Sequence, residues 1–185
     1  EIECPISTEA QHRAEASELI ARTNGRKFAI LNPAGGWVTK LWRAADFGKL
    51  ADRLDNELEL TPIVVTGPNE SELAKIVREN SRSERIIFAE PSLKGFYELA
   101  KAATVYVGGD TGPTHLAIAA SAPVVGIFGP TEWWRNGSLN PDDICVERTD
   151  IDCRVYCHRR TCANWICMDI PGETVIEAVR RRIGR

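Results

Sequence analysis

The sequence predicts an α/β fold, a doubly wound parallel sheet of the Rossmann-like kind, from two observations. Short, almost continuously apolar runs alternate along the chain with longer stretches that have helical spacing. Continuous apolar runs indicate strands buried on both faces, as they are in a parallel sheet covered by helices. Ligands of such sheets bind beyond the carboxyl ends of the strands, near the point where the strand order reverses.

Each element follows from the local sequence. Strands are predicted where apolar and β-branched residues cluster, at 27–31, 62–66, 85–88, 104–108 and 123–128. Helices are predicted from apolar residues at helical spacing, at 7–24, 46–58, 70–80, 92–103, 113–121 and 171–182. We expect Ser7 or Thr8 to cap the first helix, and the last helix to close the domain. The loops after residues 31, 66, 108 and 128 should therefore line the site.

The composition is typical of one soluble globular domain that covers residues 1–185. Hydrophobic residues make up 43% and charged residues 26% of the chain. The formal net charge of -3 provides no basic field for nucleic acid, so we expect no nucleic-acid partner. We find no apolar run of the roughly 20 residues that span a bilayer, and no features of a secretion signal. A cytoplasmic location is therefore expected, and the absence of an initiator Met favours a piece of a longer protein.

The most informative segment is the predicted strand-to-helix turn at 108–115, which reads Gly-Gly-Asp-Thr-Gly-Pro-Thr-His. Thr111, Gly112 and Thr114 can present N–H groups and hydroxyls at a helix N-terminus, which is a ready site for a phosphate. Asp110 is better suited to sugar hydroxyls or to a cation. The alternative is that Asp110 and Thr111 only cap the helix.

Two other loops carry groups suited to a nucleotide. Gly35 and Gly36 can offer amides to a phosphate, and Lys40 can neutralise its charge. The order of a Walker A loop is absent here. After the next strand, Glu70 can hold two adjacent ribose hydroxyls. The alternatives are a surface loop with a solvated lysine, and a Glu70 that only starts a helix.

Adjacent aromatic residues, Trp133 and Trp134, follow the last predicted strand. They can bracket a base or a sugar ring. Equally, a partner domain can cover them.

Most of the cysteines fall in a Cys-rich segment, which we place at 145–168. Four thiolates, those of Cys153, Cys157, Cys162 and Cys167, can bind one metal ion tetrahedrally, and a structural zinc is the metal we expect. Their spacings are wider than the usual Cys-x2-Cys pair. Iron–sulfur ligation, disulfide pairing and free thiols therefore stay open as alternatives.

Several segments together resemble the bacterial heptosyltransferase family of GT-B glycosyltransferases, glycosyltransferase family 9. They are VGGDTGPTHLAIAASAPVVGIFGPTE, NPAGGWVTKLW, VVTGPNESE and the tail CHRRTC…CM. The resemblance covers nearly all of this chain but only the C-terminal half of a family member. It implies a single donor-binding domain, with the N-terminal acceptor domain absent from this sequence.

The resemblance implies inverting transfer of a heptose from an ADP-heptose-like sugar nucleotide to a lipid-linked saccharide acceptor. The reaction belongs to lipopolysaccharide core synthesis and needs no metal cofactor. It also implies cytoplasmic work at the periphery of the inner membrane. The donor-binding residues it indicates are Gly35, Gly36, Thr39, Lys40, Glu70, Asp110, Thr111, Gly112 and His115.

Two of these residues are implied to be catalytic. Lys40 neutralises the diphosphate leaving group and Asp110 holds the transferred sugar. The general base of the family is an Asp of the N-terminal domain and is not in this chain. Trp133 and Trp134 depart from the family pattern, which leaves the donor sugar open. The competing hypotheses are a stand-alone nucleotide- or anion-binding module and a structural or interaction domain built round the cysteines.

Overall fold

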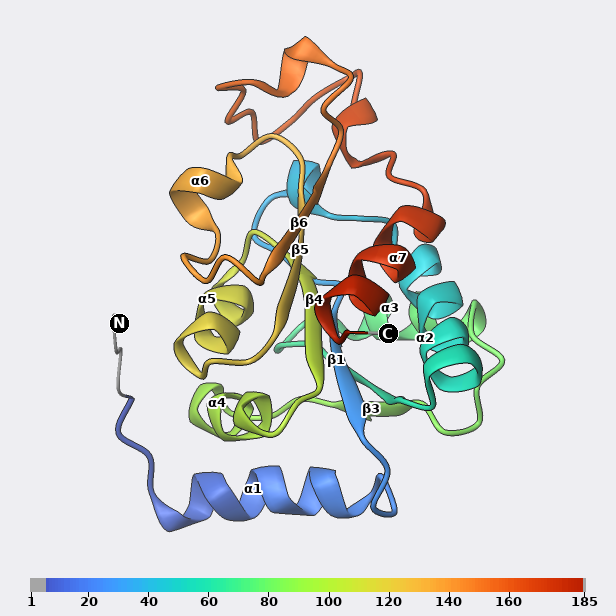
Figure 1. Cartoon of the computed structure of the whole chain (residues 1–185), viewed down its shortest axis with the longest axis vertical. Coiled ribbons are helices and arrows are strands. Elements are labelled where there is room, and N and C mark those ends of the chain that lie inside the picture. The colour runs from blue at the N-terminus through green and yellow to red at the C-terminus, as the bar shows by residue number, and fades with distance from the viewer. Residues whose placement is uncertain (1–5, 185) are drawn as a thin grey trace.

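The computed structural model of the chain describes residues 6–184, and a six-stranded sheet forms its centre (Figure 1). The strands are β1 (Phe28–Asn32), β2 (Thr61–Val65), β3 (Ile87–Ala89), β4 (Val105–Gly109), β5 (Val124–Phe128) and β6 (Ile144–Glu147). Every neighbouring pair is parallel, and the order is β3-β2-β1-β4-β5-β6. The order reverses between β1 and β4, which is the switch point of a doubly wound sheet. The predicted fold class is confirmed.

Helices cover both faces of this sheet (Figure 1). One face carries α1 (Ala10–Ala21), α4 (Leu93–Lys101) and α5 (Gly112–Ala119), and the other carries α2 (Ala44–Leu58), α3 (Ser71–Glu79) and α7 (Gly172–Arg182). Successive residues of a strand point to opposite faces. Ile30 accordingly packs in the α1–α4–α5 core, and Leu31 in the α2–α3–α7 core.

The predicted strands and long helices are present, with ends shifted by a few residues. The expected cap of the first helix was wrong. Glu9 is the N-cap of α1, where it shares a reciprocal capping box with His12. The hydroxyl of Thr8 instead hydrogen-bonds to the carboxylate of Glu98.

Two elements were not predicted. Strand β6 lies at the edge of the sheet, pairs only with β5, and has a single fully buried residue, Val146. It therefore lacks the continuous apolar run that marks the central strands. Helix α6 (Trp133–Asn136) is a single turn, too short for a periodic pattern.

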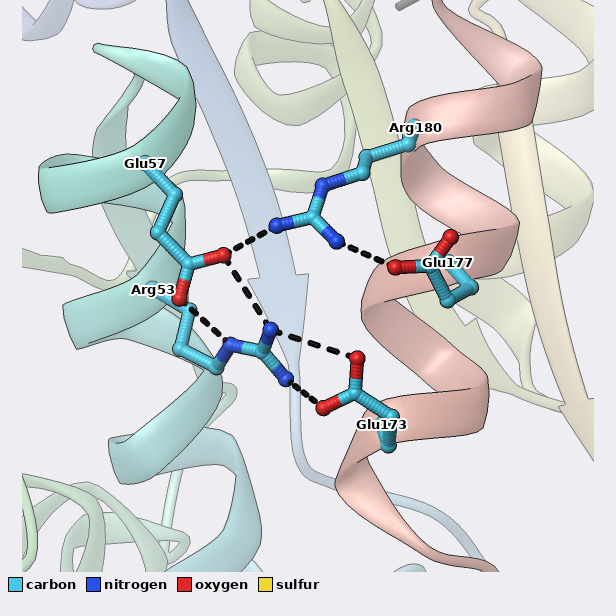
Figure 2. Close-up of polar contacts among 5 residues, drawn as sticks. All are labelled: Arg53, Glu57, Glu173, Glu177 and Arg180. Carbon is cyan, nitrogen blue, oxygen red and sulfur yellow. Dashed lines mark hydrogen bonds and ion pairs between the residues drawn. The ribbon is translucent and has the colours of Figure 1, made fainter.

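The closing helix α7 is held by apolar packing and an ion-pair network with α2 (Figure 2). Arg53 bonds to Glu57 at 2.7 Å and to Glu173 at 2.5 Å, and Arg180 joins Glu57 to Glu177. These side chains are between 28% and 65% exposed, so each pair contributes at most about 1 kcal/mol. The buried apolar side of α7 therefore supplies most of its attachment.

The segment between β6 and α7 is irregular and stands at one end of the molecule, beyond the carboxyl ends of the strands (Figure 1). It contains the short 3-10 helices η2 (Asp152–Arg154) and η3 (Ile166–Met168). Another 3-10 helix, η1 (Val38–Lys40), lies in the loop after β1. Within residues 6–184, no helix is both long enough and apolar enough to cross a membrane.

Candidate functional site

A buried ion pair joins the two loops that flank the switch point. Lys40 ends η1 in the loop after β1, and Asp110 directly follows β4. Their Nζ and Oδ2 atoms lie 2.7 Å apart, and the two side chains are only 14% and 5% exposed. The parallel register pairs Asn32 with Gly108, so both loops leave the sheet at the same edge. The chain thus places these two predicted residues in direct contact.

The carboxylate of Asp110 has further polar neighbours. Asn136 Nδ2 donates to Oδ2 at 3.1 Å, and His115 Nε2 lies 3.6 Å from Oδ1. Burial raises the pKa of Asp110, but its contacts with His115 and Lys40 outweigh burial and hold that pKa well below its ordinary value. Asp110 is therefore an ionised carboxylate whose orientation is fixed by three side chains.

Thr111 is the N-cap of α5, but its side chain makes no capping hydrogen bond. The carboxylate of Asp110 is likewise directed to Lys40 and Asn136 rather than to the helix. The helix-capping alternative thus does not describe this turn. In the first turn of α5, Pro113 has no N–H, and the N–H groups of Thr114 and His115 donate to the carbonyl of Thr111. The N–H of Gly112 is the one left to water or to a ligand.

The sequence suggested that the hydroxyl of Thr114 faces a ligand, but the structure shows that it does not. It is fully buried, and its hydroxyl contacts Tyr106 Oη at 2.9 Å and donates to the carbonyl of Gly109. These hydrogen bonds hold the turn between β4 and α5 in place from its buried side. A buried tyrosine hydroxyl needs a polar partner, and this was the available signal for the role of Thr114.

Three glycines of the two loops differ in what surrounds them. A Cβ added to Gly35 would come within 3.0 Å of Thr111 Cγ2, so the two loops pack tightly there. Gly36 and Gly112 have open space where a Cβ would stand, and neither has a positive φ. Neither the packing nor the backbone conformation of the chain therefore requires glycine at these positions. The free space beside them leaves room for a ligand to approach the backbone.

Thr39 serves the structure of its own loop. The residue is 2% exposed, and its hydroxyl donates to the carbonyl oxygen of Arg159 at 2.6 Å. Trp165 Nε1 donates in turn to the carbonyl of Thr39 at 2.9 Å. The sequence predicted that Thr39 binds the sugar-nucleotide donor, but its hydroxyl proton is used in a hydrogen bond within the protein. Sequence reasoning missed this partner because 120 residues separate the two positions.

Glu70 follows β2, the strand next to β1, and lies at the same edge of the sheet. Its Oε2 accepts a hydrogen bond from the N–H of Gly67 at 2.6 Å. The side chain makes no capping bond to α3, although its backbone occupies the N-cap position. One carboxylate oxygen is therefore engaged in the turn, and the structure brings Glu70 into no contact with the Lys40–Asp110 pair.

The two tryptophans after β5 have different surroundings. Trp133 occupies a slot where a Cβ on Gly126 or Gly137 would come within 2.3 Å of its ring, and it packs edge-on against Phe128. Trp133 is thus a packing residue that fixes α6, and α6 supplies Asn136 to the site. Trp134 is 70% exposed.

Of the five cysteines in the Cys-rich segment, three lie close enough to Cys167 for their charges to act on it. Burial raises the pKa of Cys167, and so do the charges of Cys157, Cys153 and Cys162. All four are free thiols. Across residues 6–184, no three His, Cys, Asp or Glu side chains are arranged to hold a metal ion, so the zinc site stays a prediction. Cys4 lies outside the described residues.

Fold and site together define a class of protein. The chain is a Rossmann-like domain with a Lys–Asp pair, a helix N-terminus and two unobstructed glycines at its switch point, which is where sheets of this kind bind their ligands. The chain belongs to glycosyltransferase family 9 (heptosyltransferase), whose family model matches residues 2–165. The family resemblance expected from the sequence is thereby confirmed.

Individual relatives agree with this assignment. Lipooligosaccharide heptosyltransferase 2 of Campylobacter jejuni is 26% identical over 166 residues, which are 85% of this chain and 52% of that protein. A family 9 glycosyl transferase from Veillonella parvula has the same fold, with a TM-score of 0.81, 20% identity, and coverage of 98% of this chain and 54% of that one. E. coli ADP-heptose lps heptosyltransferase II gives a TM-score of 0.77 at 16% identity, covering 96% and 53%. The chain thus spans about half the length of these relatives.

Proposed function

We propose that this chain is the donor-binding half of an inverting heptosyltransferase of lipopolysaccharide core synthesis. Its ligand is an ADP-heptose-like sugar nucleotide. The observation that carries the proposal is the buried Lys40–Asp110 pair, whose two loops each carry a glycine with an unobstructed approach. The family and the name of the E. coli neighbour supply the class of donor.

In this proposal the diphosphate lies across the switch point of the sheet. Gly36 and Gly112 allow the phosphates to approach the backbone, and the N–H of Gly112 at the start of α5 donates to them. Lys40 supplies the positive charge. Because the nucleoside diphosphate is the leaving group, negative charge develops on its phosphates in the transition state, and a fixed cation there lowers the barrier.

Asp110 is the residue that holds the transferred sugar. Its carboxylate is ionised and fixed by Lys40 and Asn136, and it accepts hydrogen bonds from sugar hydroxyls. His115, which is 53% exposed beside it, lines the same end of the site. When the ammonium group of Lys40 binds a diphosphate, the hydrogen bond from Asn136 keeps the Asp110 carboxylate in place.

Glu70 is the candidate for the ribose. Only its Oε2 is used by the turn, so a small rotation lets the carboxylate bind both ribose hydroxyls. The base that activates the acceptor, and the binding site for a lipid-linked acceptor at the membrane surface, belong to an N-terminal domain in this proposal. Catalysis on this account needs no metal ion, because Lys40 and the helix terminus stabilise the leaving group.

Calorimetry on the purified chain tests the proposal. ADP-heptose and ADP should bind, and GDP and UDP should bind more weakly if the adenine is recognised. A matched variant, Glu70→Gln, should weaken ADP but not inorganic pyrophosphate, which has no ribose. A folded chain that binds none of these nucleotides would refute the donor-binding role.

A further inference from the structure

The indole ring of Trp37, directly before η1, has two cations against it. Lys40 Nζ lies 4.1 Å from the ring centre, and the guanidinium carbon of Arg160 lies 4.9 Å from it. Because both distances end at the same indole, the two charged groups lie within about 9 Å of each other. A cation of the Cys-rich segment therefore contacts the same indole as the proposed phosphate-binding lysine.

Arg160 is brought there by a double attachment of its segment to η1. The buried hydroxyl of Thr39 donates to the carbonyl oxygen of Arg159 at 2.6 Å, one residue before Arg160. On the other side, Trp165 Nε1 donates to the carbonyl of Thr39 at 2.9 Å. The N–H of His158 is also bonded, to the carbonyl of Pro130 at 3.0 Å. The backbone around Arg160 is thus tied to the loops of β1 and β5.

Among the residues that the structure describes, the charge of Arg160 has no counterion. Its side chain is exposed, and over residues 6–184 it forms no ion pair with a carboxylate, whereas the charge of Lys40 is matched by Asp110. Two neighbouring cations repel each other, and an anion with more than one charge relieves that repulsion. A guanidinium stacked on an indole keeps its edge free, and that edge bonds phosphate oxygens in pairs.

We propose that Arg160 is a second phosphate-binding residue of the donor site, which contacts the β-phosphate of a nucleoside diphosphate beside Lys40. This inference rests on the proposed function, because it requires a diphosphate at Lys40. It gives the Cys-rich segment a part in donor binding. The segment acts on the donor through the arginine that it carries.

The test is calorimetry of the purified chain with ADP and AMP, which differ only in the β-phosphate. Arg160→Gln should weaken ADP binding about fivefold and leave AMP binding nearly unchanged. Arg159→Gln is the matched control, because it removes the same charge from the neighbouring exposed side chain. It should alter neither affinity. Thermal unfolding of both variants shows that the fold is intact.

The outcomes separate this inference from the proposed function. ADP binding that Arg160→Gln leaves unchanged, while a Lys40 variant loses it, overturns the role of Arg160 and leaves the donor site standing. Equal weakening of ADP and AMP, or an equal effect of Arg159→Gln, also overturns it, because either result indicates a general field rather than a β-phosphate contact. Failure of the unaltered chain to bind ADP overturns both proposals.

Discussion

Two ion-pair clusters of this molecule differ in what surrounds them. The α2–α7 network holds Arg53 and Arg180 among three glutamates, so every cation is shared between carboxylates on the outside of the domain. The Lys40–Asp110 pair is buried at the switch point, next to open space and the uncapped N-terminus of α5. The comparison shows that a large number of ion pairs does not identify a ligand-binding site. A buried ion pair with free space for a ligand, located at the switch point, is the better indicator.

The largest expected effect comes from breaking the buried pair. Lys40→Met should cost about 3 kcal/mol of unfolding free energy, because it leaves the carboxylate of Asp110 buried without its cation. Urea unfolding measures this cost. The double variant Lys40→Met with Asp110→Asn should recover most of the stability but not ADP binding. If Lys40→Met costs no more than a substitution of Arg53, the contrast between the clusters is wrong.

A pair of glycines separates binding from stability. Gly112 and Gly172 are the first residues of α5 and α7, and both have open space where a Cβ would stand. Alanine at either position should leave stability unchanged or raise it by up to about 1 kcal/mol. Only Gly112→Ala should weaken ADP binding, about tenfold, because the new methyl occupies the space of a phosphate. Equal ADP affinity in the two variants would contradict a phosphate at Gly112.

The pH dependence distinguishes the two clusters further. The pKa of Asp110 is lowered in the folded chain, so its carboxylate stabilises the fold above its unfolded pKa of about 3.9, and this contribution is lost as the pH falls through the folded pKa. The stability difference between the unaltered chain and Asp110→Asn should thus stay constant from pH 7 to about pH 5 and shrink below about pH 4.

Glu57 provides the comparison in the α2–α7 network. Its pKa is also lowered, mainly by the hydrogen bond from Arg53, but its side chain is 35% exposed. Glu57→Gln should therefore give a smaller difference with the same sign. Denaturant unfolding across this pH range checks both. An Asp110→Asn difference that disappears near pH 6 would show that the pKa of Asp110 is raised instead.

The smallest effect is expected in the surface network itself. Arg53→Gln should cost less than about 1 kcal/mol, because its partners are solvent-exposed, and the loss should diminish at high salt. ADP affinity should not change. A loss of nucleotide binding in this variant would mean that α2 and α7 are coupled to the site in a way the contacts do not indicate.

Much of the fold could be predicted from the sequence, because central strands buried on both faces leave continuous apolar runs. β6 leaves no such run, since it is an edge strand with one fully buried residue. α6 depends on Trp133 filling the slot beside Gly126 and Gly137, and that slot exists only after the sheet has formed. Local sequence carries no signal for such a tertiary contact.

Residues of the candidate site could be predicted where they lie in loops directly after a predicted strand. Lys40 and Asp110 were found because loops at the carboxyl edge of a parallel sheet meet at the switch point. The internal role of Thr39 and the approach of Arg160 to Trp37 were not, because both depend on a segment 120 or more residues further along the chain. Periodicity and turn chemistry describe neighbours in sequence and cannot register such contacts.

The most direct test of the central claim is an NMR titration of the isotope-labelled chain with ADP. The account predicts that the largest shifts occur at the amides of Gly36, Lys40 and Gly112, while those of Glu57 and Arg180 stay in place. Saturable shifts that centre on α2 and α7, or no shifts at millimolar ADP, would contradict the assignment of the switch point as the nucleotide site.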